Sequence, residues 1–202
     1  MPYSSFTLAE LPKRFGLIIK EEHNLFANIA EIKPSQSLAL VFQENIELAT
    51  LIGTEKARSE FLIAPVLAEV RRQLNYQISL FSGSEFNVDL EQGLQGFCDF
   101  LLSGSREQLF INAPVVAIVE AKKEDIITGL GQCGAEMVAA QIFNQRQNNT
   151  ISTIYGVVTS GTNWRFLWLK DKVICIDLME YYIKEIDKIL GILITMSGEY
   201  LS

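Results

Sequence analysis

Hydrophobic residues recur at helical spacing in the first third of the chain. This spacing predicts helices over residues 37–51 and 55–74, because apolar side chains three or four positions apart lie on one helix face. Pro65 falls inside the second helix and should kink it, since proline lacks an N–H and clashes with the preceding turn. Thr7, followed three positions later by Glu10, predicts a short capped helix. Residues 11–35 are expected to be irregular or to form short strands.

Beyond residue 75 the pattern changes to short apolar runs separated by Gly, Ser, Asn or Asp, which is typical of strands. The predicted strands are QISLFSG, LQGFCDFLLSG, VVAIVEAK, TIYGVVTSG and WRFLWLKDKVICID. Helices are predicted over residues 124–147, between the third and fourth strands, and over 179–196. Gly129, Gly131 and Gly134 weaken the first of these helices, which suggests that it packs closely against a sheet.

Consecutive strands predict antiparallel hairpins, whereas the strand-helix-strand passage predicts a parallel pair in the same sheet. The expected architecture is therefore an α/β domain with a mixed central sheet flanked by helices. The run of residues 115–119 is apolar on both faces and belongs at the centre of that sheet. We expect residues 1–54 to form a helical or irregular extension that packs on a core of residues 55–202.

Length and composition agree with a single globular domain. The chain has 202 residues, is 49% hydrophobic and carries a net charge of −7, so binding to nucleic acid would require a local basic patch. Its three cysteines match no zinc spacing and suggest a reducing cytoplasm. We expect no signal peptide and no membrane span, because no apolar stretch reaches about 18 residues.

The central strand ends in a way that burial alone does not explain. In PVVAIVEAKKED, Glu120 and Lys122 follow an apolar run without a turn, and alternate residues of a strand share a face. The Ala121 carbonyl can face the site between them. The preceding strand carries Asp99 among apolar residues, where an unpaired carboxylate is costly. If a hairpin sets Asp99 beside Glu120, a bound cation would relieve their repulsion.

Asp99 followed by Glu120-Ala121-Lys122 resembles the PD-(D/E)xK signature of restriction-endonuclease-like nucleases. KARSEFLIAPVLAEVRR resembles the first core helix of that family, in which Glu60 matches an acidic site residue. GVVTSGTNWRFLWL is similar to a strand pair in the nuclease domain of type I restriction subunits and related stand-alone proteins. Some relatives carry a Gln-x-x-x-Tyr motif on the helix after the lysine; here Gln132 matches, but Glu136 replaces the tyrosine.

The resemblance implies a restriction-endonuclease-like fold and a Mg²⁺- or Mn²⁺-dependent nuclease that hydrolyses DNA phosphodiester bonds. Asp99, Glu120, the Ala121 carbonyl and Glu60 would hold the metal, and Lys122 would position or deprotonate the attacking water. Glu69 lies nine residues from Glu60, on the opposite side of a helix with 100° steps, so only one of the two can face the site.

Four further residues are candidates for phosphate contacts, and each of them has an ordinary surface role as the alternative: Gln132, Lys56, Arg71 and Lys123. Lys56 and Arg71 lie within about 40° of Glu60 on a helical wheel.

Two other interpretations stay open. Glu120 and Lys122 could form a simple strand-end ion pair, worth about 0–1 kcal/mol. The chain could also be a catalytically inactive nuclease-fold protein that serves as an accessory or regulatory subunit. A homodimer or a partner subunit is compatible with both the nuclease and the accessory function.

Overall fold

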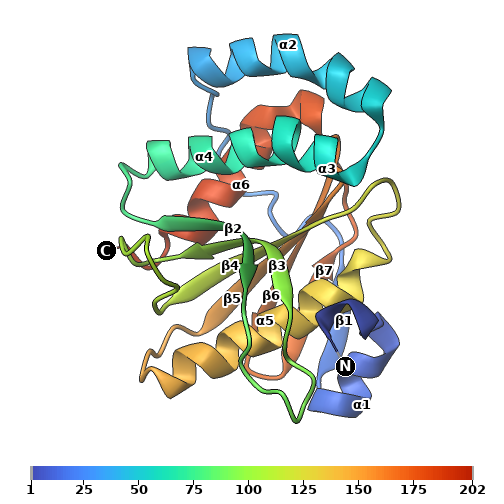
Figure 1. Cartoon of the computed structure of the whole chain (residues 1–202), viewed down its shortest axis with the longest axis vertical. Helices are drawn as coiled ribbons and strands as arrows, with labels where there is room; N and C mark the ends of the chain where they lie inside the picture. The colour runs from blue at the N-terminus through green and yellow to red at the C-terminus, as the bar shows by residue number, and fades with distance from the viewer. Residues whose placement is uncertain (1, 202) are drawn as a thin grey trace.

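The computed structural model describes residues 2–201, which form an eight-stranded sheet with helices on both faces (Figure 1). The strands are β1 (Ile18–Glu22), β2 (Ser79–Glu85), β3 (Phe97–Ser103), β4 (Val115–Ala121), β5 (Thr153–Thr159), β6 (Asn163–Lys170), β7 (Val173–Asp177) and β8 (Tyr181–Tyr182). The α-helices are α1 (Leu11–Phe15), α2 (Gln36–Ile52), α3 (Glu55–Arg58), α4 (Ala64–Gln73), α5 (Gly129–Arg146) and α6 (Ile186–Gly198). No helix in this part of the chain is long and apolar enough to cross a membrane.

The sheet is mixed, as the order of predicted elements indicated. Its strand order is β1-β7-β6-β5-β4-β3-β2, with the short β8 paired to β6. Strand β4 runs parallel to β5, and β1 runs parallel to β7, while the other pairs are antiparallel. Every residue of β4 is buried. The prediction that this strand lies inside the sheet is therefore confirmed.

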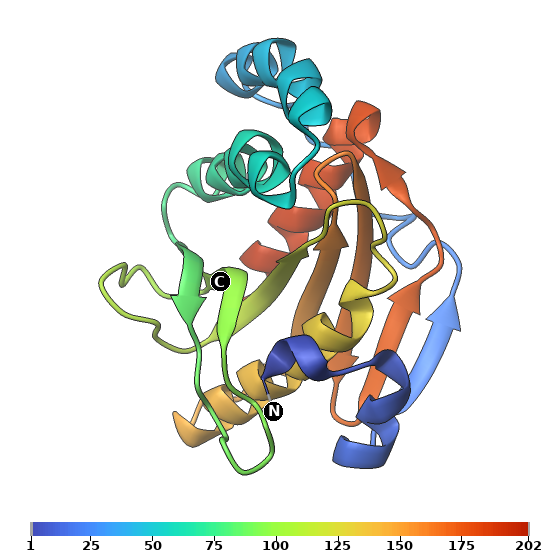
Figure 2. The same ribbon diagram turned by 45° about the vertical axis from the view of Figure 1, so that its right-hand side comes forward.

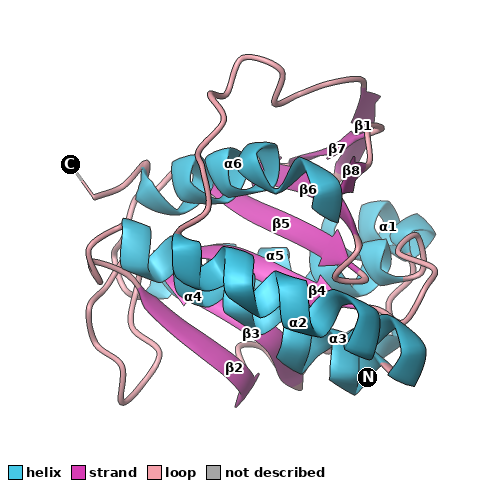
Figure 3. Cartoon of the chain, turned by 90° about the horizontal axis from the view of Figure 1, so that it is seen from above, coloured by secondary structure: helices cyan, strands magenta, loops and turns pink. Residues whose placement is uncertain are grey.

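Helices cover the two faces unequally. Helices α2, α3, α4 and α6 lie on one face, and α5 lies on the other (Figure 3). Each face has its own hydrophobic core, and successive β4 side chains enter opposite cores: Ile118 packs on the α5 side and Val119 on the side of α4 and α6. Because alternate strand residues share a face, Glu120 follows Ile118 to the α5 side.

The predicted helix over residues 55–74 is divided into three parts. Thr54 caps α3, since its hydroxyl accepts from the Ala57 N–H at 3.1 Å. One π-helical turn, Ser59–Ile63, then joins α3 to α4. Pro65 lies in the first turn of α4. The disturbance expected from the missing proline N–H is thus found just before Pro65.

The first 54 residues contribute to the sheet as well as packing on it. Strand β1 lies beside β7 at one edge (Figure 2), with Ile18 opposite Val173. Tyr3, Phe6 and Leu11 are buried in the core on the α5 side. The capped turn predicted at Thr7 is present, because the Thr7 N–H donates to Glu10 Oε2 at 2.7 Å. The extension is therefore built into the core.

Three predicted boundaries were wrong. The segment 164–177 is a hairpin of β6 and β7, because the chain turns at Asp171, whose φ is +52°. Helix α5 begins at Gly129 because residues 122–128 form a loop. The last helix begins at Ile186, since residues 181–182 pair with β6 instead. In the first two cases a pattern was extended through a turn or loop that has no Gly or Pro, and in the third it was extended through the short strand β8.

The glycines of α5 mark two close approaches. A Cβ at Gly129 would lie 2.6 Å from a Val158 methyl group in β5, so this glycine packs on the sheet as predicted. Cβ atoms at Gly131 and Gly134 would instead overlap the Phe6 backbone and the Leu11 side chain. The absence of a side chain at these two positions lets the N-terminal segment pack directly against α5.

We predict that Gly131→Ala destabilises the protein by about 1–3 kcal/mol, because the added methyl group meets backbone atoms that cannot yield cheaply. Gly198→Ala is the matched control, since its Cβ would meet only a flexible Leu74 methyl group at 3.1 Å. Chemical denaturation measures both variants. Equal stabilities for the two would contradict the close packing described.

Candidate active site

The pairing of β3 with β4 brings the first two candidate residues together. Phe100 lies opposite Val119 in this antiparallel pair, which puts Asp99 next to Glu120. Asp99 Oδ2 accepts a hydrogen bond from the Ala121 N–H at 2.8 Å. The N–H and C=O of one strand residue point to the same side, so the Ala121 carbonyl points toward β3 as well. The predicted adjacency of Asp99 and Glu120 is confirmed.

Glu120 and Lys122 form a partly buried ion pair on the α5 side of β4. The Glu120 side chain is 1% exposed and that of Lys122 is 21% exposed. Glu120 Oε1 accepts from Lys122 Nζ, whereas Glu120 Oε2 is buried without a hydrogen-bond partner. This pair is not a simple surface ion pair. Its unpartnered carboxylate oxygen is shielded from water, and burying such an oxygen lowers the stability of the fold.

Two side chains of helix α5, Gln132 and Glu136, extend a chain of hydrogen bonds that begins at Lys122. Lys122 Nζ donates to Gln132 Oε1 at 3.4 Å, and Gln132 Nε2 donates to Glu136 Oε1 at 3.1 Å. Glu136 is fully buried, and its Oε2 has no partner. The stem of Lys122 lies against Gly129, at 3.1 Å from the position of an added Cβ. The sequence identified Gln132 as a candidate, but it gave no role to Glu136.

A pocket of about 270 Å³ opens on the other side of this strand end. It is lined by Glu55, Lys56, Ser59, Glu60, Ser82, Gly83, Asp99 and Ala121. Asp99 and Ala121 therefore form part of the pocket wall. The Glu120 carboxylate lies behind them, within the core.

Both acidic residues of the α3 region line this pocket, but they differ in their surroundings. Glu60 pairs with Lys56 at 2.7 Å, and the two side chains are 54% and 81% exposed. Glu55, at the first position of α3, is close enough to raise the pKa values of Glu120 and Lys122. Sequence reasoning missed Glu55, although its place directly after the cap Thr54 was a visible signal. Glu69 faces away, where it accepts from the Ser35 N–H at 3.0 Å.

Burial controls the electrostatics of the site. Burial, and then the nearby Asp99, raise the pKa of Glu120 to about 8, although Lys122 opposes the shift. Burial, and then Glu120, also raise the pKa of Glu136 well above its usual range. For Lys122, burial acts to lower the pKa, but Glu120 outweighs it and the pKa is raised. Lys122 therefore carries its proton at neutral pH.

The predicted phosphate contacts are dispersed. Lys56 lines the pocket, and Gln132 holds Lys122. Lys123 is exposed in the bend that follows β4. Arg71 lies near the other end of β3, where its Nε donates to the Ile78 carbonyl at 3.1 Å and its guanidinium stacks on Tyr76. The helical wheel placed Arg71 near Glu60 because it assumed an uninterrupted α-helix, and the π-helical turn changes that phase.

The described residues, 2–201, contain no group of three His, Cys, Asp or Glu side chains that is arranged to hold a metal ion by itself. Comparison of the chain with protein-family models, curated proteins and solved structures finds no match. The case for a function therefore depends on the site itself.

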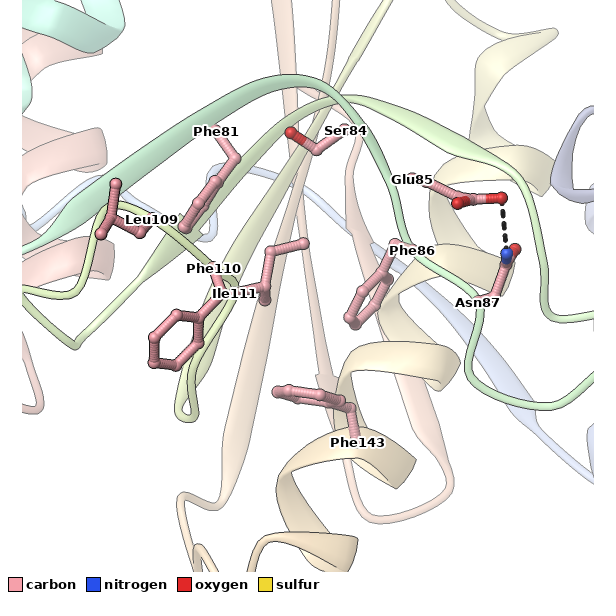
Figure 4. A pocket seen from close by; sticks show the side chains of 9 residues that line it. All are labelled: Phe81, Ser84, Glu85, Phe86, Asn87, Leu109, Phe110, Ile111 and Phe143. Atoms are coloured by element: carbon pink, nitrogen blue, oxygen red, sulfur yellow. Dashed lines mark hydrogen bonds between the residues drawn. The ribbon is translucent and has the colours of Figure 1, made fainter.

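A second pocket lies beside β2 and the end of α5, and its lining is mainly aromatic and aliphatic (Figure 4). Phe81, Phe86, Phe110 and Phe143 point into it, and Glu85 is bonded to Asn87 at 2.7 Å. No cation lines this pocket. Without a positive charge in its lining, this pocket is not suited to hold a phosphate.

The raised pKa of Glu120 predicts that stability depends on pH. The folded protein keeps this proton between about pH 4.3, where an unfolded glutamate loses it, and about pH 8. The free energy of unfolding should therefore fall as pH rises through this interval.

Glu120→Gln should make that slope shallower and leave the part that comes from Glu136, whose pKa is also raised. Denaturation in the presence of a chelator measures the slope directly. Gln145→Ala, at an exposed position of α5, serves as the control and should keep the wild-type slope. A Glu120→Gln curve parallel to that of the wild type would show that Glu120 titrates normally.

Proposed function

We propose that the protein is a metal-dependent nuclease that hydrolyses DNA phosphodiester bonds at the end of β4. The observation that carries this proposal is the meeting of two carboxylates and a lysine at one strand end. Asp99 and Ala121 line a pocket there, and the Glu120–Lys122 pair lies directly behind them on the α5 side. A purely structural ion pair would need neither the second carboxylate nor the opening. This arrangement also supports a restriction-endonuclease-like identity for the sheet.

The donor set fits Mg²⁺ or Mn²⁺. Asp99 accepts one hydrogen bond through Oδ2, Glu120 has a buried oxygen without a partner, and the Ala121 carbonyl points toward β3. These are hard oxygen ligands of the kind that Mg²⁺ takes, and Mg²⁺ usually needs only one or two carboxylates together with waters and substrate phosphates. The absence of a three-acid cluster among residues 2–201 is therefore compatible with such a site. Glu55 or Glu60 would assist from the pocket wall.

Each residue has a distinct role in this proposal. Asp99, Glu120 and the Ala121 carbonyl hold the ion, which when bound supplies positive charge to the scissile phosphate. Lys122 is protonated, so it acts by orienting the water and stabilising charge on the phosphate rather than by removing a proton. Lys56 and Lys123 lie where they can contact flanking phosphates.

The second candidate function is that of an inactive accessory protein on the same fold, alone or with a partner subunit. Two observations favour it. The net charge is −7, and Glu120 Oε1 is already occupied by the Lys122 ammonium group in the structure. Metal binding separates the two functions, because the accessory protein has no need of an ion.

We predict that the wild type cleaves plasmid or single-stranded DNA when Mg²⁺ or Mn²⁺ is present. Lys122→Ala and Asp99→Ala should each lower the rate by on the order of 10²–10³, because the first removes the ammonium group that stabilises the phosphate and the second removes a ligand of the ion. Lys170→Ala, at an exposed end of β6, is the control for loss of a lysine elsewhere. Undiminished cleavage by both site variants would refute the proposed active site.

Metal binding tests the same site without requiring activity. Calorimetric titration with Mn²⁺ should detect binding to the wild type and little or none to Asp99→Asn. Asp89→Asn, which removes a surface carboxylate paired with Arg146, should bind as the wild type does. Glu55→Gln should weaken binding more than Glu60→Gln, because Glu55 acts electrostatically on Glu120. A folded wild type that binds no ion would favour the accessory function.

A further inference from the structure

Glu136 is a buried carboxyl group that the proposed reaction leaves without a role. It lies on α5, is fully buried, and has no cation as an ion-pair partner among the described residues. Its Oε2 has no hydrogen-bond partner at all. A leucine of similar size would fill this place at lower cost, because an uncompensated buried carboxyl group destabilises a fold.

The neighbours of Glu136 do not offset that cost. Burial, and then Glu136 itself, raise the pKa values of the Cys98 and Cys133 thiols, so both stay neutral. After burial, Glu120 has the largest effect on the pKa of Glu136, and it raises that pKa further. Packing and electrostatics therefore give no reason for a carboxyl group here, whereas the bond to Gln132 does.

Gln132 and Glu136 are four residues apart and thus lie on one face of α5. A glutamine amide has a donor end and an acceptor end. Glu136 Oε1 accepts from the amide Nε2, which turns the Gln132 Oε1 toward Lys122 Nζ. If the amide were reversed, its donor end would face the ammonium group, which is itself only a donor. Glu136 thereby fixes which end of Gln132 meets the lysine.

We propose that Glu136 is a positioning residue, which orients the Gln132 amide so that Lys122 is held at the site. This inference rests on the proposed function for its catalytic meaning, but the orientation of Lys122 can be measured in a protein that cleaves nothing. Lys122 itself remains the group that acts on the substrate. Glu136 acts only through Gln132.

The experiment compares Glu136→Leu with Glu136→Gln. The leucine fills the volume without an acceptor, whereas the new glutamine keeps an acceptor for Gln132. Met137→Leu is the matched control, because Met137 is the adjacent buried residue of α5 and the exchange conserves volume. Selective ¹³C labelling of lysine, with assignment by Lys122→Arg, gives the two Hε protons of Lys122 as a direct readout.

In the wild type the two Hε protons of Lys122 should be inequivalent, because the side chain is fixed. In Glu136→Leu the difference between their chemical shifts should shrink, although the contact with Glu120 remains. The kcat should fall roughly 10- to 100-fold with KM unchanged, and the melting temperature should rise by about 2–4 °C. Glu136→Gln should restore the inequivalence and most of kcat. A gain in stability together with a loss of rate is a result that simple core filling does not give.

A wild-type difference between the Hε shifts in Glu136→Leu would overturn the inference, as would a parallel loss of stability and rate that Glu136→Gln does not restore. If Glu136→Leu fails to fold, Gln132→Met decides: it should free Lys122 in the same way, and an unchanged Lys122 signal would overturn the proposal. A wild type without cleavage activity would defeat the proposed nuclease function alone, because the lysine signal still tests the positioning role.

Discussion

The hydrogen bond from the Ala121 N–H to Asp99 Oδ2 is the interaction on which the candidate site depends. It joins the end of β4 to β3 beyond the last regular pair, Phe100 and Val119, where a side chain replaces the backbone carbonyl as the acceptor. Strand register is strict, because a slip of one residue would turn every side chain of β3 to the other face. The buried apolar residues on both faces of β3 and β4 therefore fix the distance between two carboxylates that repel each other.

That arrangement costs stability, and the cost is concentrated in a few residues. Glu120 and Glu136 both enter the core on the α5 side, and each has one oxygen without a partner. Lys122 compensates Glu120 directly and reaches Glu136 only through Gln132. Strained or unsatisfied polar groups are expected where function, rather than folding, selects the residue. The large apolar cores on both faces of the sheet make this local cost tolerable.

The sequence was sufficient to predict the mixed sheet, the buried β4 and the adjacency of Asp99 and Glu120, because these follow from apolar periodicity and strand order. It was insufficient where a turn lacks Gly or Pro. Asp171 adopts a left-handed conformation, which aspartate tolerates, but a single Asp between two lysines was too weak a turn signal to divide the segment. The prediction that Arg71 lies near Glu60 was wrong for a related reason. The π-helical turn between them changes the angle at which residues follow each other around the helix. The contribution of Glu136 depends on tertiary contacts that no local pattern encodes.

The parallel pairing of β1 with β7 has a consequence for synthesis of the chain. Ile18 lies opposite Val173, so β1 is synthesised long before β7, the strand that it pairs with. Until β7 is made, the apolar side chains that precede β1, such as Leu11 and Phe15, have no completed core to enter. Contacts of such long sequence separation slow folding and prolong the exposure of unpaired strands. The segment that contains β1 is therefore exposed to aggregation until β7 is made, and this edge of the sheet forms only after most of the other strands exist.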